Sequence, residues 1–423
     1  RTGPAPCGRP ACPTERATGT GRTAQRPENT ERDERMSIVG GVGGVGGVGG
    51  VGGVGGVGGV GGVGVVGGVG GVGGVGGVGD LSLSAYDGGT TTGLIVSTDA
   101  IIGPEAPAVA PAAMTANAAD NMARWSERVR QLTLMADLMG GLGHVGSGES
   151  VGVFHLETAG GSPSAAPVAT YHPLIDLTRP TPADFVAQMP LVLAYAEQRA
   201  DRAAEIVSQV GFPTAYFAAV AGMNLSRNPR TLELIALAQQ IAGTVAMRTK
   251  HALAVVRPDR YSAQLQPIIP TPGHGALPSG HATEAFVVAR LLIHLTAGRV
   301  ALPDLPRLLM ALAARVATNR VVAGVHFPAD SYCGAVIGIT LADWLAARAG
   351  AGVAVRQASF NGPGIEGMDF ELDALVDATT HALADVSNPE GGALVARGAE
   401  IPAAKIGVSA PLEWLWGEAR GEW

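Results

Sequence analysis

Hydrophobic residues between positions 181 and 350 recur every three to four residues, which is the spacing of amphipathic helices. Proline stands at or near the start of several of these stretches, where its missing N–H breaks no helical hydrogen bond. Patterns typical of strands are nearly absent from the same region. The predicted helices span residues 182–209, 212–222, 228–256, 280–297, 303–322 and 328–349. We therefore predict an all-α fold, built as a helical bundle.

The segments on either side of this bundle have weaker patterns. Residues 118–139 predict one helix, and the Gly-, Pro- and Ser-rich stretch 140–181 predicts loops with one short strand at residues 151–156. After the bundle, residues 368–386 predict an amphipathic helix, and a tail broken by Pro and Gly follows. We interpret the tryptophans of the tail as residues that dock it on the core or on a second subunit; they are Trp414, Trp416 and Trp423.

The start of the chain has the composition of a segment without a core. Residues 1–35 are rich in Arg, Thr, Pro and Glu, which predicts a disordered leader, and Met36 is a candidate for the true start. Residues 36–80 carry a Gly-Gly-Val repeat, which we interpret as a low-complexity tether that activity does not need. The predicted organisation is leader 1–35, repeat 36–80, helix- and loop-rich elaboration 81–180, helical core 181–350, and C-terminal helix and tail 351–423.

Charge and cysteine content exclude several classes of protein. The net charge of −7 does not favour nucleic-acid binding. The three cysteines, Cys7, Cys12 and Cys333, form neither a disulfide framework nor a zinc-site spacing, and we interpret Cys333 as a small buried apolar residue. No signal peptide is recognised, and no window of membrane-spanning length is free of charge. We take cytoplasmic residence as the default.

Polar residues that could form a buried site lie in three groups within the predicted bundle. Lys250 and Arg257 are seven residues apart on one helix, so their side chains leave the same face. An ammonium and a guanidinium both suit an anionic oxygen. The alternative for this pair is the solvated face of a helix, because Arg248 stands beside Lys250.

The second group is the run Pro278-Ser279-Gly280-His281 at a loop-to-helix junction. The free N–H groups at a helix N-terminus favour an anion, and glycine lets the backbone approach it closely. Ser279 would add a hydroxyl donor, and His281 could act as an acid–base group. The alternative is an ordinary helix cap followed by a hydrogen-bonded histidine.

The third group is Arg320, His326 and Asp330. Asp330 falls near the third position of a predicted helix, from which its carboxylate can turn back toward His326. A carboxylate on one imidazole nitrogen makes the other nitrogen a better nucleophile or ligand. The alternative is a capping aspartate with a nearby surface histidine.

Taken together, the pattern Lys-x6-Arg-Pro, Pro-Ser-Gly-His and Arg-x5-His-x3-Asp resembles the signature of the type 2 phosphatidic acid phosphatase and vanadium haloperoxidase superfamily. The resemblance implies a helical bundle of the acid phosphatase and vanadium haloperoxidase type. It also implies that Lys250, Arg257 and Arg320 hold equatorial oxygens of phosphate or vanadate. Hydrogen bonds from Ser279 and the Gly280 N–H would complete this oxyanion site.

The same resemblance assigns the catalytic residues. It implies that His281 is the acid–base group and that His326 attacks phosphorus or coordinates vanadium, with Asp330 orienting it. One position departs from the pattern, because Asn319 stands where the family usually has serine. Since asparagine can also hydrogen-bond, we expect a modest effect on the pocket.

Two observations bear on the branch of the superfamily. Its lipid phosphatases have membrane-spanning helices, which the sequence does not predict. His274 lies seven residues before His281. In this it resembles the bromoperoxidases of the family, which have a second histidine at the same offset. We therefore favour a vanadium-dependent haloperoxidase-like enzyme, with vanadate as cofactor and peroxide and halide as substrates.

Two alternatives stay open. One is an acid phosphatase that hydrolyses phosphomonoesters through a phosphohistidine and needs no cofactor. The other is a non-catalytic helical protein that binds an oxyanion. A homo-oligomer is compatible with each of them.

Overall fold

The computed structural model describes residues 88–101, 109–159 and 164–423. The predictions for the leader 1–35 and the repeat 36–80 lie outside these residues. The chain divides into two units, Arg1–Ala106 and Pro107–Trp423. In the first unit the structure describes one helix, α3 (Gly88–Ile101). The second unit contains all the residues predicted to form the site.

Four helices form the core of the second unit, and three of them pack around the central helix α9. Their bounds are α8 Pro229–Leu253, α9 Gly280–Thr296, α10 Leu305–Val322 and α11 Pro328–Arg348. Helix α11 is buried along nearly its whole length, Cys333 included, as expected for a helix that is apolar on every side. Gly338 lets α11 approach α9 closely, because a Cβ at this position would lie 2.5 Å from the Thr283 carbonyl oxygen.

The predicted helix 182–209 is present but divided into three consecutive pieces. They are α5 (Pro182–Ala194), the 3-10 turn η4 (Tyr195–Gln198) and α6 (Arg199–Ser208). The first begins at the predicted cap, where the Asp184 N–H donates to Thr181 Oγ1 at 3.2 Å. Helix α7 (Thr214–Ala221) follows, and the 3-10 turn η5 (Pro258–Arg260) comes after α8.

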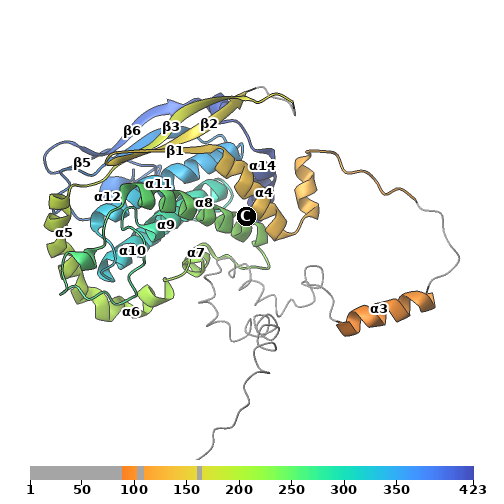
Figure 1. Cartoon of the computed structure of the whole chain (residues 1–423), viewed down its shortest axis with the longest axis horizontal. Helices are drawn as coiled ribbons and strands as arrows, with labels where there is room; N and C mark the ends of the chain where they lie inside the picture. The colour runs from red at the N-terminus through yellow and green to blue at the C-terminus, as the bar shows by residue number, and fades with distance from the viewer. Residues whose placement is uncertain (1–87, 102–108, 160–163) are drawn as a thin grey trace, which may run out of the picture. The chain divides into compact units, whose positions relative to one another are not determined.

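The all-α prediction is wrong, because the second unit also contains a six-stranded mixed sheet in the order β1-β2-β3-β4-β6-β5. Strands β3 and β4 pair in parallel and the other neighbours pair antiparallel. The sheet lies along one side of the helices, and β3 and β4 contact α11 (Figure 1). The strands are β1 Leu142–Ser147, β2 Ser150–Ala159, β3 Val168–Thr178, β4 Val355–Asn361, β5 Val386–Ser387 and β6 Ala393–Ile401.

All these strands come from the two flanking segments that were predicted to be mostly loop and helix. The short strand predicted at residues 151–156 lies within β2, whose alternating buried positions include Val151 and Val153. The helix predicted at residues 368–386 is wrong. That segment holds the single-turn helix α12 (Leu372–Leu375) and ends at the start of β5.

The remaining helices fasten the ends of the second unit to the core. The turn η3 and helix α4 replace the predicted helix 118–139, and α14 packs against α8 and η3. Trp416 is buried, and Trp423 Nε1 donates to Thr231 Oγ1 of α8 at 3.0 Å, so the tail docks on the core as interpreted. Within the described residues, no helix combines the length and apolarity that crossing a bilayer requires. The bounds are η3 Ala119–Arg124, α4 Glu127–Gly140, α13 Ala403–Ile406 and α14 Ala410–Gly421.

Candidate active site

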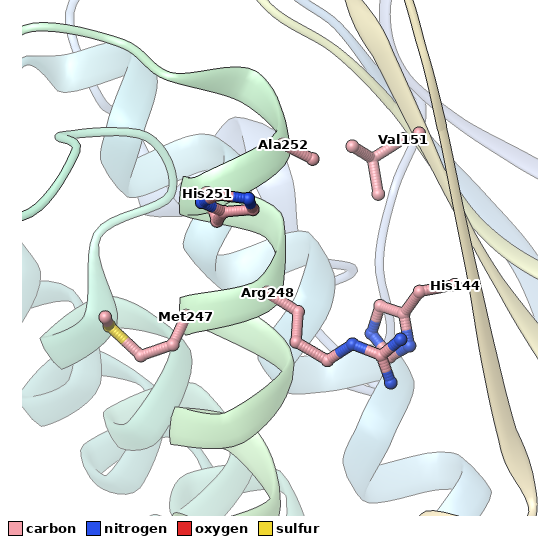
Figure 2. Close-up of a pocket in the computed structure, with 7 residues that line it drawn as sticks. His144, Val151, Met247, Arg248, His251 and Ala252 are labelled. Carbon is pink, nitrogen blue, oxygen red and sulfur yellow. The ribbon is translucent and has the colours of Figure 1, made fainter.

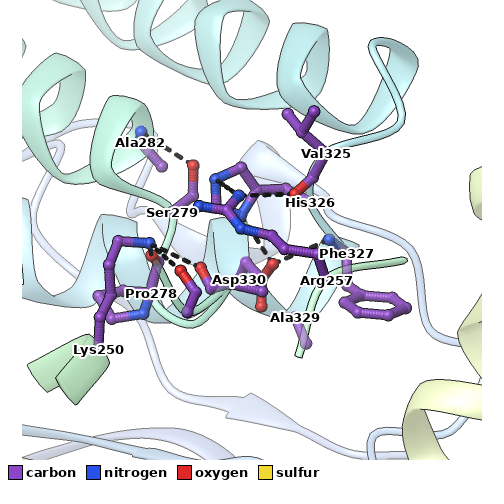
Figure 3. Close-up of polar contacts among 12 residues, drawn as sticks. Lys250, Arg257, Pro278, Ser279, Ala282, Val325, His326, Phe327, Ala329 and Asp330 are labelled. Atoms are coloured by element: carbon purple, nitrogen blue, oxygen red, sulfur yellow. Dashed lines mark hydrogen bonds and ion pairs between the residues drawn. The ribbon is translucent and has the colours of Figure 1, made fainter. Parts of the chain in front are cut away.

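Lys250, near the end of α8, fastens the loop that leads into α9 (Figure 3). Only 2% of the residue is exposed, and Nζ donates to the carbonyls of Gly275 at 3.0 Å, Ala276 at 2.9 Å and Pro278. Burial lowers the pKa of this ammonium to about 7. Arg248, in contrast, is exposed, so the solvated-surface alternative describes Arg248 and not Lys250.

Arg257 connects this loop to His326. Its Nε donates to the carbonyl of His274 at 3.0 Å, and Nη2 donates to the ring Nδ1 of His274 at 3.0 Å. On the other side Nη1 donates to the Val325 carbonyl at 2.7 Å and lies 2.9 Å from His326 Nε2. Burial lowers the pKa of the guanidinium. The contacts place His274, an exposed residue, at the edge of the site.

His326 and Asp330 form a buried pair at the start of α11 (Figure 3). Asp330 Oδ2 lies 2.8 Å from His326 Nδ1 and accepts from the Phe327 N–H at 3.0 Å. Because a guanidinium can only donate, Arg257 requires a lone pair on Nε2 of His326, and the ring proton must be on Nδ1. The imidazole is therefore neutral, with its Nε2 lone pair directed into the site.

Burial has opposite effects on the pKa values of these two groups. It lowers the pKa of His326 well below its usual value, with the positive charge of Arg257 as the next cause. It raises the pKa of Asp330 to about 6. Asp330 Oδ1 has no hydrogen-bond partner among the described residues, which leaves this oxygen free for a group that the chain does not supply.

The N-terminus of α9 lies beside this pair. Ser279 caps the helix through its hydroxyl, which accepts from the Ala282 N–H at 3.4 Å, and its own N–H donates to the Asp330 carbonyl at 2.9 Å. A Cβ at Gly280 would meet no atom within 4 Å, so there is open space beside the first turn. The unpaired N–H groups of a helix N-terminus would face an anion placed there.

Arg320 and His281 approach the site from α10 and α9, and both hydrogen-bond to the end of α6. Arg320 is 1% exposed, and its Nη2 donates to the Ile206 carbonyl at 3.0 Å and to Gln209 Oε1 at 3.4 Å. Its Nε and Nη1 are buried without a partner among the described residues. His281 Nε2 donates to the Gln209 carbonyl at 2.8 Å.

Burial and mutual charge also affect these two groups. Burial lowers the pKa of Arg320 to about 10 and that of His281 to about 3, and the charge of Arg320 is the second cause of the His281 shift. His281 is therefore neutral at pH 7. Its proton is on Nε2 and its lone pair is on Nδ1.

The structure thus brings together all nine residues singled out from the sequence, which are Lys250, Arg257, His274, Ser279, Gly280, His281, Arg320, His326 and Asp330. Their net charge is positive, with three cations facing one carboxylate. Lys250 and Arg257 donate most of their hydrogen bonds to other groups of the protein, whereas two nitrogens of Arg320 have no partner among the described residues. Two unpaired donors on a buried cation are costly, and an oxyanion would satisfy them.

Sequence reasoning missed Gln209, which is completely buried and contacts both Arg320 and His281. A glutamine at the end of a helix carries no signal for such a role. Asn319 was noted only as a departure from the family pattern. Its Nδ2 donates to Gln209 Oε1 at 2.9 Å, so Asn319 is connected to Arg320 through the side chain of Gln209.

A separate cavity of about 420 Å³ lies between the β1–β2 hairpin and α8 (Figure 2). Arg248 and His251 line it from the exposed side of α8, and His144 lines it from β1. It contains none of the nine residues. The described residues hold no group of three or more His, Cys, Asp or Glu side chains arranged for a metal ion.

Comparison with known proteins supports the signature. Residues 231–350 match the family described as the PAP2 superfamily. No curated protein matches the chain. Among solved structures, a transmembrane PAP2-type phosphatidylglycerolphosphate phosphatase from Bacillus subtilis has 17% identity and a TM-score of 0.25, and the match covers 38% of this chain and 92% of that one.

Proposed function

With residues 231–350 forming a PAP2 superfamily domain, we propose that this chain is a phosphatase-type enzyme that hydrolyses a phosphomonoester through a phosphohistidine. The observation that carries the proposal is the hydrogen-bond chain from Asp330 through His326 to Arg257. It leaves a neutral imidazole whose Nε2 lone pair lies among cations, as a nucleophile that attacks an anionic phosphoryl group requires.

In the first step, His326 Nε2 attacks phosphorus and the bond from phosphorus to the ester oxygen breaks. The positive charge that develops on the imidazole is balanced by Asp330, which already accepts the Nδ1 proton at 2.8 Å. The leaving alkoxide takes a proton from His281, whose pKa a bound dianion would raise from its low value. In the second step, a water molecule gives a proton to His281 and attacks phosphorus, the bond from phosphorus to His326 Nε2 breaks, and phosphate leaves with both histidines restored.

Binding of the phosphoryl group must also free the nucleophile, because Arg257 Nη1 occupies His326 Nε2 at 2.9 Å. Phosphoryl oxygens are stronger acceptors than an imidazole nitrogen and would take over this donor. The unpaired nitrogens of Arg320 and the N-terminus of α9 would hold the remaining oxygens. Lys250, whose three donors go to backbone carbonyls, keeps the loop before Ser279 in place.

A second candidate is the vanadium-dependent haloperoxidase activity, which His274 favours. His274 lies against Arg257, with its Nδ1 3.0 Å from Nη2, and so stands at the mouth of the anion site. Vanadate resembles phosphate in shape and charge. The free donors of Arg320 would hydrogen-bond to its oxygens, and Nε2 of His326 would hold the vanadium. When bound, vanadate would supply the activation of peroxide for halide oxidation.

Two assays on the purified full-length chain separate these functions. Hydrolysis of p-nitrophenyl phosphate that orthovanadate inhibits would support the phosphatase. Vanadate-dependent bromination of a phenol dye by peroxide, without hydrolysis, would favour the haloperoxidase. Vanadate binding without either activity would indicate a non-catalytic oxyanion-binding protein.

Matched histidine variants test the site itself. His326→Ala removes the nucleophile, and we expect loss of either activity. His251→Ala removes an exposed histidine of α8 outside the site and should leave activity unchanged. Full activity in His326→Ala would refute the assignment of the nucleophile.

A further inference from the structure

The C-terminal end of α6 contacts two groups of the candidate site at once. The Ile206 carbonyl accepts from Arg320 Nη2 at 3.0 Å, and the Gln209 carbonyl accepts from His281 Nε2 at 2.8 Å. The last carbonyls of a helix lack intrahelical donors and carry the negative end of the helix dipole. The end of α6 is therefore suited to hold a guanidinium and an imidazole N–H.

The side chain of Gln209 adds a second connection to the same groups. It is fully buried, and its Oε1 accepts from Asn319 Nδ2 at 2.9 Å and from Arg320 Nη2 at 3.4 Å. Its Nε2 donates to Glu205 Oε1 at 3.1 Å. With both ends of the amide bonded, the orientation of the side chain is fixed.

Asn319 belongs to the same network. Its Oδ1 accepts from Arg202 Nη1 at 3.2 Å while its Nδ2 donates to Gln209. A serine hydroxyl can also donate and accept, but it is shorter and does both from one oxygen, so it would not reach Arg202 and Gln209 as the two ends of the Asn319 amide do. The pair Gln209–Asn319 therefore forms a support for Arg320 that the usual serine would not provide.

We propose that Gln209 is a positioning residue for the oxyanion site. Its side chain and its carbonyl fix Arg320 and His281, so that Nε and Nη1 of Arg320 stay free for the anion. Gln209 precedes the region 231–350 that matches the PAP2 superfamily. The inference rests on the proposed function, because it requires that an oxyanion bind at Arg320.

The test measures binding of orthovanadate to the full-length chain by isothermal titration calorimetry. Gln209→Met removes both polar atoms and keeps the length of the side chain. We expect the Kd to rise about tenfold, because a hydrogen bond to a charged group has this effect. Asn319→Ser, which keeps Gln209, should raise it by a smaller factor. Gln357→Met, the same change on β4, is the matched control and should leave the Kd unchanged.

A double-mutant cycle distinguishes positioning from general damage. In an Arg320→Met background, Gln209→Met should change the vanadate Kd no further, because its effect acts through the missing guanidinium. A purely structural role would lower the melting midpoint and leave the Kd of the folded protein unaltered. That result, or additive effects in the double variant, would overturn the inference.

The remaining outcomes are also decisive. If Gln209→Met fails to fold by circular dichroism, Asn319→Ser carries the same test, and an unchanged Kd in that variant refutes the positioning role. If the unsubstituted chain binds no vanadate, the proposed function and this inference fall together. If it binds vanadate and the variants bind it equally well, the inference alone fails.

Discussion

Replacing Asp330 with asparagine is the most direct test of how His326 is activated. Asp330 Oδ2 accepts from His326 Nδ1 and from the Phe327 N–H, whereas Oδ1 has no partner among the described residues. An amide oxygen can take the place of Oδ2, and the NH2 group can take the place of Oδ1. The substitution therefore removes the charge and keeps the shape.

The magnitude follows from the hydrogen bond that is weakened. In the proposed mechanism the imidazole becomes positively charged as Nε2 bonds to phosphorus, so the hydrogen bond from Nδ1 to Asp330 would strengthen in the transition state. Hydrogen bonds to charged groups contribute about 1.5–3 kcal/mol. At about 1.36 kcal/mol for each factor of ten, kcat should fall roughly 10- to 150-fold.

The assay is the pH dependence of kcat for p-nitrophenyl phosphate hydrolysis. Burial raises the pKa of Asp330 from 3.8 to about 6, so activity of the unsubstituted chain should fall below that pH as the carboxylate takes up a proton. In Asp330→Asn this acid limb should be absent. Asp343→Asn, on the same helix α11 but paired with Arg290 and His294, is the matched control and should leave kcat unaltered.

The same pKa shift has a consequence for stability. Between pH 3.8 and about 6 the folded chain keeps a proton on Asp330 that the unfolded chain releases. This group therefore contributes stability below the unfolded pKa that is lost as pH rises through the folded pKa. A kcat for Asp330→Asn close to that of the unsubstituted chain, with the acid limb still present, would refute the role of Asp330.

Three further substitutions test separate parts of the site and the core. Arg320→Gln removes the two unpaired donors, so KM for p-nitrophenyl phosphate should rise about tenfold or more, and an unchanged KM would count against anion binding there. Gly280→Ala adds a Cβ with no atom within 4 Å, so the melting midpoint should hold while the vanadate inhibition constant rises severalfold; undiminished inhibition would place the anion elsewhere. Gly338→Ala would set a Cβ 2.5 Å from the Thr283 carbonyl oxygen, so the free energy of unfolding should fall by about 1–3 kcal/mol, measured by thermal denaturation. An unchanged melting midpoint would contradict the close approach of α9 and α11.

The helices were predictable because their limits are set locally. Thr181 caps α5 with its own side chain, Ser279 caps α9, and Pro328 opens α11. A cap or a proline acts within one turn, so the sequence alone contains the information. The division of the predicted helix 182–209 into α5, η4 and α6 could not be predicted from such local cap and proline signals.

The sheet was missed because its information is not local. Strand β3 pairs in parallel with β4, and the whole helical bundle lies between these two strands in the sequence. Glycines inside the strands also resembled loop signals. A Cβ at Gly143 would lie 2.9 Å from the Tyr171 ring, and one at Gly152 would lie 2.7 Å from the Phe154 ring, so these glycines make room for aromatic side chains within the sheet.

For the site, the sequence indicated which residues carry charge but not where their donors go. Lys250 and Arg257 were both expected to hold the anion, and the structure directs the three Lys250 donors and most of those of Arg257 to backbone carbonyls and histidines. Those partners lie in loops whose course depends on the tertiary fold. The same is true of Gln209, which reaches Arg320 only because α6 ends beside α10.

This distribution of donors implies an order in which an anion engages the site. Arg320 offers nitrogens that need no rearrangement, and the N-terminus of α9 offers its first N–H groups. Arg257 Nη1 is bonded to His326 Nε2 and to the Val325 carbonyl, so in the proposed mechanism it would turn to the anion as the anion arrives. In the proposed mechanism, anion binding and the release of His326 would therefore be coupled through one guanidinium. His326 Nε2 would stay hydrogen-bonded to Arg257 until an oxyanion lies within reach, which would restrict its reactivity to groups that compete for Arg257.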